Sequence, residues 1–222
     1  MMGACVQMLG DKPPQNESWP LEHGDHHELD DLEFLNDEDS QKHQSIVGLF
    51  QWVIAIGHLD VTTAIVTLSS FYAMPQKGYI LHAQHAHSHL VKWKDAVIRI
   101  WTKEPDHSDL LGFNFDWLWS AHGDGEEPTP DDAPKPLGKC MMSTHCLDAN
   151  LCHDMTNGRS AAGVLNFLNQ TPMNGCSKKQ ATIETAMCGS EFVTAKTCIK
   201  KIVDLHSTLQ CLGVPLHKKS HQ

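Results

Sequence analysis

Two carboxylates in the C-terminal part of the chain could act together on a divalent cation. Asp148 ends a short run of alternating apolar residues, and Glu191 lies in a later stretch, SKKQATIETAMCGSEF (177–192), with helical periodicity. A carboxylate at a strand end and another on a packed helix can converge on one hard cation, because such ions take oxygen ligands. Two such ions clamp the attacking and leaving oxygens of a phosphodiester. Spacing alone does not establish such a site.

The elements that would position these carboxylates are strands followed by a helix. Three strands are predicted where apolar residues alternate, at 142–148, 161–168 and 173–177. Asn157-Gly158 is a turn signal between the first two. A helix is predicted over 184–212, because apolar residues recur at helical spacing and Gly213 and Pro215 follow it. The face expected to be buried comprises Cys188, Phe192, Ala195, Ile199, Ile202 and Leu209.

The segment HCLDANLCHDMTNGRSAAGVLNFLNQTPMNGCSKKQATIETAMCGSEF (145–192) resembles the ribonuclease H portion of copia-type LTR retrotransposon Pol polyproteins. In that family the first strand ends in an Asp-Ala pair, and a Gly-Arg-Ser-like turn leads into a hairpin. A Ser-Lys-Lys-Gln segment then precedes the helix that carries the catalytic Glu. On this match Asp148 corresponds to the first catalytic Asp and Glu191 to the catalytic Glu.

The resemblance implies an α/β fold for 140–222, a partial ribonuclease H-like mixed sheet with a packed helix. It implies that Asp148 and Glu191 are catalytic and bind Mg²⁺. The implied substrate is an RNA–DNA hybrid, whose RNA strand is cut by a metal-activated water. Basic residues could contact the phosphates of such a duplex, and the candidates are Arg159, Lys178, Lys179 and Lys196, with Lys200, Lys201, Lys218 and Lys219 flanking it.

The match is incomplete in two ways. The family places four acidic positions around two Mg²⁺ ions, and its next catalytic Asp lies in a Gly-Asp-Asn-like strand expected beyond Gln222. Two carboxylates can hold one ion weakly but cannot position a pair, so we expect the chain to be inactive alone and marginally folded. The family commonly has Arg at several of the His positions, and Tyr at the positions of Cys146, Cys152, Cys188 and Cys211. These exchanges are typical of a degenerate copy under relaxed selection.

Residues 41–103 are patterned as helices. Apolar residues at helical spacing predict a helix across 46–54, a second after Gly57 with Asp60 as its N-cap, and a third across 79–94. Pro75 and Gly78 are expected to end the second helix. The run AVIRIWT (96–102) alternates and predicts a strand.

This helical block is similar to the end of a copia-type reverse transcriptase, where a short helix, a turn and a longer helix close the polymerase. The turn here is His58-Leu59-Asp60-Val61. The polymerase's paired aspartates lie upstream in the family and are absent from this sequence. Polymerisation is therefore not assigned to the chain.

Charge divides the sequence into segments. Residues 1–40 carry 11 acidic residues against 1 basic, which favours an acidic, poorly ordered arm. Residues 104–139 carry 9 against 2 and are rich in Pro and Gly, which indicates a linker. The segments expected to fold, 41–103 and 140–222, are mildly basic. Alternating aromatic residues in the linker could form a short docked strand, and these are Phe113, Phe115, Trp117 and Trp119.

The sequence favours an intracellular protein that does not enter a membrane, in either cytoplasm or nucleus. The first residues lack a basic region followed by an apolar one, so no secretory signal is expected. The most apolar run, 46–57, is too short to span a bilayer. In such a compartment the 8 cysteines are expected to be reduced thiols.

Two clusters would support zinc binding instead. His82, His85 and His89 share one helix face, but no nearby carboxylate or Cys in the sequence completes a site. The second cluster lacks the Cys-x-x-Cys pairs of structural zinc sites, and it comprises Cys140, His145, Cys146, Cys152 and His153. A polar helix face and small buried thiols explain both more simply. The alternative function is a non-catalytic interaction or zinc-binding protein derived from the element.

Overall fold

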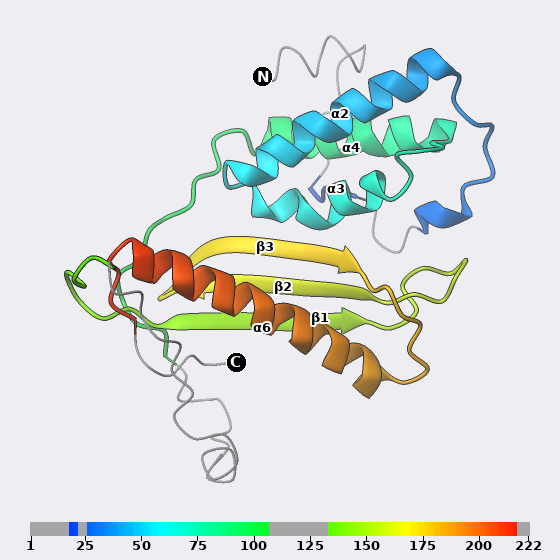
Figure 1. Cartoon of the computed structure of the whole chain (residues 1–222). Helices are drawn as coiled ribbons and strands as arrows, with labels where there is room; N and C mark the ends of the chain where they lie inside the picture. Colours follow the sequence, from blue (N-terminus) through cyan, green and yellow to red (C-terminus); the bar gives the residue numbers. More distant parts are fainter. Residues whose placement is uncertain (1–17, 22–25, 107–132, 217–222) are drawn as a thin grey trace.

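A computed structural model describes residues 18–21, 26–106 and 133–216. A helical block lies on one side of a small antiparallel sheet, and a long helix crosses the other face of that sheet (Figure 1). The predicted aromatic strand at 113–119, Lys218, Lys219 and most of the acidic arm lie outside the described residues.

The helical block contains α2 (Asp37–Ala55), α3 (Thr62–Ser69) and α4 (Lys77–Lys92), with short 3₁₀ turns η1 (His27–Leu29) and η2 (Leu59–Val61). The side chain of Asn36 caps α2, where its Oδ1 accepts a hydrogen bond from the Asp39 amide at 2.8 Å. Asp37, Glu38 and Asp39 fill the first turn, where negative charge is favourable against the helix dipole. The helix therefore begins inside the acidic segment 1–40.

The core of this block is apolar and continuous. The rings of Phe71 and Tyr79 stack with centroids 4.4 Å apart, which joins the loop after α3 to the first turn of α4. The predicted helical spacing of α2 and α3 is confirmed by the residues that are buried. These are Ile46, Val47, Phe50, Val53, Val61, Ile65, Leu68, Tyr79, Ala83, Ala86 and Leu90.

Three local predictions in this block are wrong. Asp60 does not cap α3, because it lies within η2 and its carboxylate accepts a hydrogen bond from His89 instead. Gly78 belongs to the first turn of α4, and the second helix ends earlier, at Ser69. Residues 96–102 form no strand. This segment is joined to the start of the third strand by a hydrogen bond, in which the Trp101 amide donates to the Thr171 side chain at Oγ1 over 2.7 Å.

The described sheet has the order β1-β2-β3, with β1 (Ser143–Asn150), β2 (Ala161–Leu168) and β3 (Thr171–Lys179). The three predicted strands are confirmed, each to within a few residues. Both pairings are antiparallel, whereas a mixed sheet was expected. Asn169 adopts a φ of 53° in the tight turn between β2 and β3, a conformation that Asn tolerates well.

After the long helix the chain returns to the outer edge of β1. Gly213 has a φ of 71°, as expected for a residue that ends a helix in the left-handed conformation. The Met141 amide then donates to the Pro215 carbonyl at 2.8 Å, and Met141 forms a parallel bridge with Leu216. Within the described residues, the remainder of this edge of β1 has no strand beside it.

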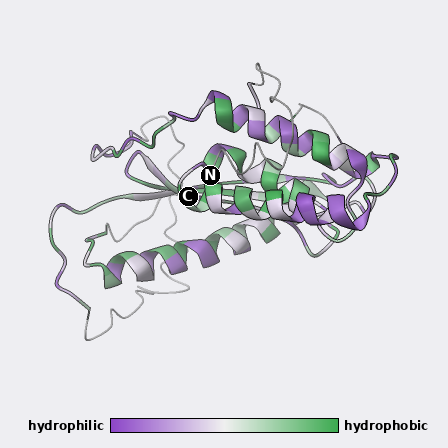
Figure 2. Cartoon of the chain, turned by 90° about the horizontal axis from the view of Figure 1, so that it is seen from above, coloured by the Kyte–Doolittle hydropathy of each residue, from purple (hydrophilic) through white to green (hydrophobic). Residues whose placement is uncertain are grey.

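The long helix α6 (Met187–Cys211) packs on β1 and β2, but with a different face from the one predicted. Polar and apolar residues are interspersed along its length (Figure 2). Ile202 and Leu209 are buried as expected, whereas Cys188, Phe192 and Ile199 are exposed. The buried face is instead built from Ser190, Thr194, Cys198, Ile202 and Leu209.

A pair of identical substitutions tests this packing. Ile202 is 8% exposed and Ile199 is 51% exposed on the same helix. We expect Ile202→Ala to lower the free energy of unfolding by about 2–4 kcal/mol, since it leaves a cavity. Ile199→Ala should cost less than about 1 kcal/mol. Urea unfolding of both variants measures the difference, and equal costs would mean that α6 is rotated from the orientation described.

Candidate functional site

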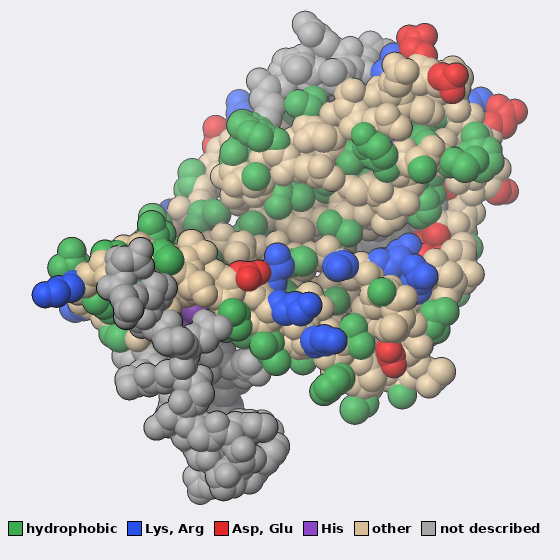
Figure 3. Space-filling view, viewed as in Figure 1, with side chains coloured by type: hydrophobic (Ala, Val, Ile, Leu, Met, Phe, Trp, Pro, Cys, Tyr) green, Lys and Arg blue, Asp and Glu red, His purple; other side chains and the backbone are tan. Residues whose placement is uncertain are grey.

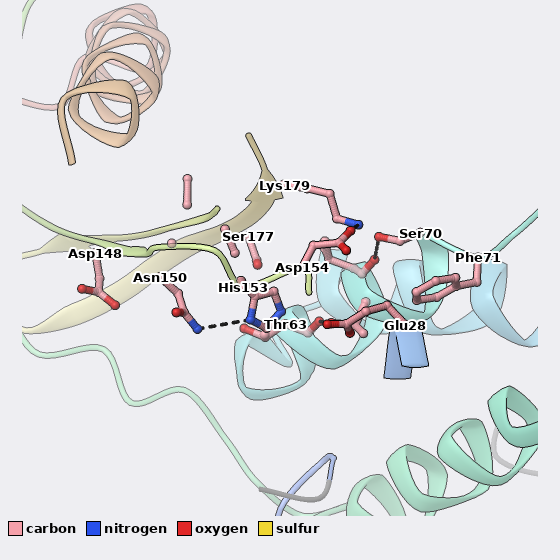
Figure 4. A pocket seen from close by; sticks show the side chains of 15 residues that line it. Glu28, Thr63, Ser70, Phe71, Asp148, Asn150, His153, Asp154, Ser177 and Lys179 are labelled. Carbon is pink, nitrogen blue, oxygen red and sulfur yellow. Dashed lines mark hydrogen bonds and ion pairs between the residues drawn. The ribbon is translucent and has the colours of Figure 1, made fainter. Parts of the chain in front are cut away.

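The alternation of β1 decides which side chains can meet above each face of the sheet. Ser143 and His145 point toward α6, where Ser143 Oγ lies 2.8 Å from His206 Nε2. Asp148 and Asn150 have the opposite parity and are exposed. They line a cavity that α3 closes from the other side. Figure 4 shows both side chains at this cavity.

The structure does not bring Asp148 and Glu191 together. Glu191 belongs to α6, which packs on the opposite face of the sheet, and its side chain is half-buried. It is not among the residues that line either cavity containing Asp148. A shared Mg²⁺ at these two carboxylates therefore stays a prediction.

The cavity between α3 and the sheet has a volume of about 240 Å³. Its walls combine hydroxyls from α3 with charged side chains from the segment after β1 and from η1 (Figure 4). Gly163 of β2, which pairs with Asp148 of β1, also lines the cavity. The polar and charged residues around it are Glu28, Thr63, Thr67, Ser70, Asp148, Asn150, His153, Asp154, Ser177 and Lys179.

Asp154 organises the loop between β1 and β2. Its Oδ1 accepts hydrogen bonds from the Thr156 amide at 3.0 Å, the Thr156 hydroxyl at 2.6 Å and the Asn157 amide at 3.3 Å. Its Oδ2 accepts from Asn157 Nδ2 at 2.8 Å and from the Lys179 ammonium. Burial alone would raise the pKa of Asp154, but these donors and the charge of Lys179 hold it well below its ordinary value. The carboxylate therefore stays ionised although it is only 3% exposed.

Glu28 ties the acidic N-terminal segment to the same loop. Its Oε1 accepts a hydrogen bond from the Met155 amide at 2.9 Å and lies 3.0 Å from His26 Nδ1. Burial would raise the pKa of Glu28, but these donors lower it overall. The residues of η1 are therefore held against a loop more than a hundred positions away in the sequence.

The predicted nucleic-acid contacts fall into two groups. Arg159, Lys178 and Lys196 are exposed and could meet a phosphate backbone. Lys179 is half-buried and bound to Asp154, and its ammonium lies 5.9 Å from the centre of the Phe71 ring. Its role in this structure is to join the end of β3 to the loop and to the helical block.

Neither zinc cluster is assembled. In the described part of the chain, no group of three or more His, Cys, Asp or Glu side chains could hold a metal ion. Along α4, His89 Nε2 lies 2.9 Å from Asp60 Oδ2 and His85 Nε2 lies 2.9 Å from the Trp19 carbonyl. His145 is buried beneath α6 against Asn166, while Cys146 and Cys152 are exposed.

Sequence reasoning missed Asp154 and Glu28. The signal for Asp154 was present, because Asp-x-Thr-Asn-Gly is a typical turn sequence in which the Asp side chain bonds the following amides. Glu28 carried no local signal, since its partner amide belongs to a distant loop.

The sequence matches no protein-family model and no curated protein, and the fold matches no solved structure. Across the described residues, no helix is both long and apolar enough to cross a lipid bilayer. The function is therefore inferred from the chain's own residues.

The charge on Asp154 should show in the pH dependence of stability. The pKa of Asp154 is lower in the folded state than its ordinary value of 3.8. Its contribution to the free energy of unfolding is therefore present above pH 3.8 and is lost as the pH falls below that value. We expect Asp154→Asn to lower the free energy of unfolding at pH 7 by about 1–3 kcal/mol, with a smaller gap near pH 3.

Urea unfolding at the two pH values measures this gap. Asp148→Asn is the matched control, since the exposed Asp148 should cost less than about 0.5 kcal/mol. A gap that does not change with pH would contradict the role assigned to the charge of Asp154.

Proposed function

We propose that this chain is a piece of a copia-type retrotransposon Pol protein that is inactive by itself. Residues 41–103 would be the helical end of the reverse transcriptase, and 140–222 the opening part of a ribonuclease H-like domain. The family acts by RNA-directed DNA synthesis and by cleavage of RNA in RNA–DNA hybrids.

One observation carries the proposal, and it is the path of the chain around β1. Three antiparallel strands are followed by α6, and the chain then returns to the open edge of β1 in the parallel direction at Leu216. A helical crossover that leads to a parallel strand is what extends an antiparallel hairpin into a mixed sheet. A ribonuclease H-like fold needs that extension at this edge.

The geometry also supports the expected lack of activity. Two-metal cleavage requires carboxylates that converge, so that both ions contact the same phosphate. Asp148 faces the cavity under α3, and Glu191 lies on the helix that covers the other face. An Mg²⁺ ion at Asp148 would lack Glu191 as a ligand, which leaves its binding weak.

The surface charge is compatible with a nucleic-acid partner. Lys and Arg side chains gather on the face that carries α6 and the end of β3, whereas acidic side chains gather near the start of α2 (Figure 3). The exposed members on β3 and α6 are Lys178, Lys196, Lys200 and Lys201. Such a surface would bind a duplex mainly through its phosphates and without sequence preference.

Cleavage of a labelled RNA–DNA hybrid in Mg²⁺ tests the catalytic part. We expect the 222-residue chain to give no product above a metal-free control. The coding sequence should then be read beyond codon 222. If it encodes a further acidic strand, a chain that includes this strand should cut the hybrid, and Asp148→Asn should abolish the cutting.

Two results would decide against this reading. Mg²⁺-dependent cutting by the 222-residue chain, lost in Glu191→Gln, would show that the chain is active alone. An extended chain that is folded and carries the acidic strand, but does not cut, would remove the basis for the family assignment.

The basic surface is tested by binding. We expect the double variant Lys196→Gln and Lys200→Gln to bind a hybrid duplex more weakly, and to reduce the slope of log affinity against log salt by about 2. Fluorescence anisotropy over a salt series measures both quantities. Lys42→Gln is the control, because Lys42 pairs with Glu38 and Asp39 on α2. An unchanged salt slope in the double variant would exclude this face as the contact.

A further inference from the structure

Within the described part of the chain, two buried histidines of the helical block have ring nitrogens without a hydrogen-bond partner. His43 on α2 is 0% exposed, and neither of its ring nitrogens has a partner. His87 on α4 is 3% exposed, and its Nε2 has none. A neutral imidazole can occupy such a position as a mainly apolar ring, but an imidazolium needs water or an acceptor for each N–H.

The elements packed around these rings offer little compensation for a positive charge. Helix α3 contains no charged residue. The rings of His43 and Tyr79 have centroids 6.3 Å apart, and burial lowers the pKa of His43 and of His87. The ionisable groups of the surrounding elements and their flanking residues are Asp37, Glu38, Asp39 and Lys42 on α2, Lys77, Tyr79, His82, His85, His89 and Lys92 on α4, His58 and Asp60 at η2, Tyr72 after α3, and His26, Glu28, Asp30, Asp31 and Glu33 before α2.

Most of these groups already have partners. Lys42 pairs with Glu38 and Asp39, and Lys77 pairs with Glu33. Asp60 bonds to His89. Asp30 is the exception, because its Oδ2 is buried without a partner among the described residues. Burial, together with the charges of Asp30, Glu28 and Asp154, raises the pKa of Tyr79.

We propose that α2 and α4 form an acid-sensitive pair that opens when His43 and His87 take up protons, at a pH below about 6. In the closed pair the described residues offer no acceptor to either N–H of a His43 imidazolium, and none to Nε2 of a His87 imidazolium. Opening hydrates both rings, and the protonated open state therefore gains population as the pH falls. This inference is independent of the proposed function.

The sign of the effect follows from proton linkage. Once opened, each ring titrates near the ordinary value of 6.5, whereas in the closed pair protonation is resisted. Stability is therefore complete above about pH 6.5 and falls below it. Each histidine increases the opening equilibrium constant by up to about tenfold per pH unit in that range.

His89 provides a contrast within the same helix. It is buried as well, but its Nε2 lies 2.9 Å from the exposed carboxylate of Asp60. Asp60 thus gives this ring an acceptor at Nε2, which the described residues do not give to His43 or to Nε2 of His87. His145 in the sheet is also buried, and burial lowers its pKa, so the two halves of the molecule must be observed separately.

Amide hydrogen exchange, resolved by residue, tests the proposal in the full chain. Between pH 7.5 and pH 5.0 we expect the protection factors of buried amides in α2 and α4, corrected for intrinsic exchange, to fall by at least about a hundredfold in the wild type. In the double variant His43→Leu and His87→Leu they should change by less than about threefold. His85→Gln on α4 is the control and should behave as the wild type.

Two outcomes would overturn the proposal. One is an equal fall in the double variant. The other is a titration of the His43 ring near pH 6.5, followed by NMR in the wild type, while α2 and α4 remain protected. The NMR titration uses the unsubstituted chain, so it decides the question even if the double variant does not fold.

Discussion

The buried carboxylate of Asp154 is the interaction on which the joining of the two halves depends. It fixes the loop after β1 by accepting four hydrogen bonds from backbone and side-chain groups of Thr156 and Asn157, and it holds β3 through Lys179. The same loop presents the Met155 amide to Glu28, and Lys179 lies near the ring of Phe71. Phe71 in turn stacks on Tyr79 in the helical core. A single ionised group thus connects strand, loop and helices, because a buried charge demands many donors at once.

The strands and the existence of the helices could be predicted from the sequence, but the start of α2 at Asp37, the end of α3 at Ser69 and the packing of α6 could not. Alternation and the turn at Asn169 define the hairpin locally. Along α6, however, the buried face uses polar residues: Gln180 donates to the Ser190 carbonyl at 2.9 Å and to Thr194 Oγ1 at 3.0 Å. Hydroxyl groups can be buried when they have hydrogen-bond partners, so a prediction from apolar positions alone selected the wrong side of the helix. Residues 96–102 alternate like a strand, but strand formation also needs a partner edge, which sequence periodicity does not reveal.

The candidate site shows the same division between local and long-range information. The sequence correctly places Asp148 near the end of a strand and Glu191 near the start of a helix. Whether the two carboxylates meet depends on the parity of β1 relative to α6, and a shift of one residue moves every side chain to the other face. Asp154 lies in a recognisable turn sequence but was not predicted as a key residue. Its importance comes from its contact with Lys179 of β3, which lies 25 positions away in the sequence.

The open edge of β1 has a consequence for the behaviour of the chain in solution. Apart from the bridge at Met141, the described residues leave the outward amides and carbonyls of Ser143–Asn150 without a neighbouring strand. Such an edge is a template for any extended segment, including the same strand of another molecule. The edge contains one charged residue, Asp148, in its eight positions. Asp148, the carboxylate expected to be catalytic, is therefore also the one charge on β1 that opposes such pairing.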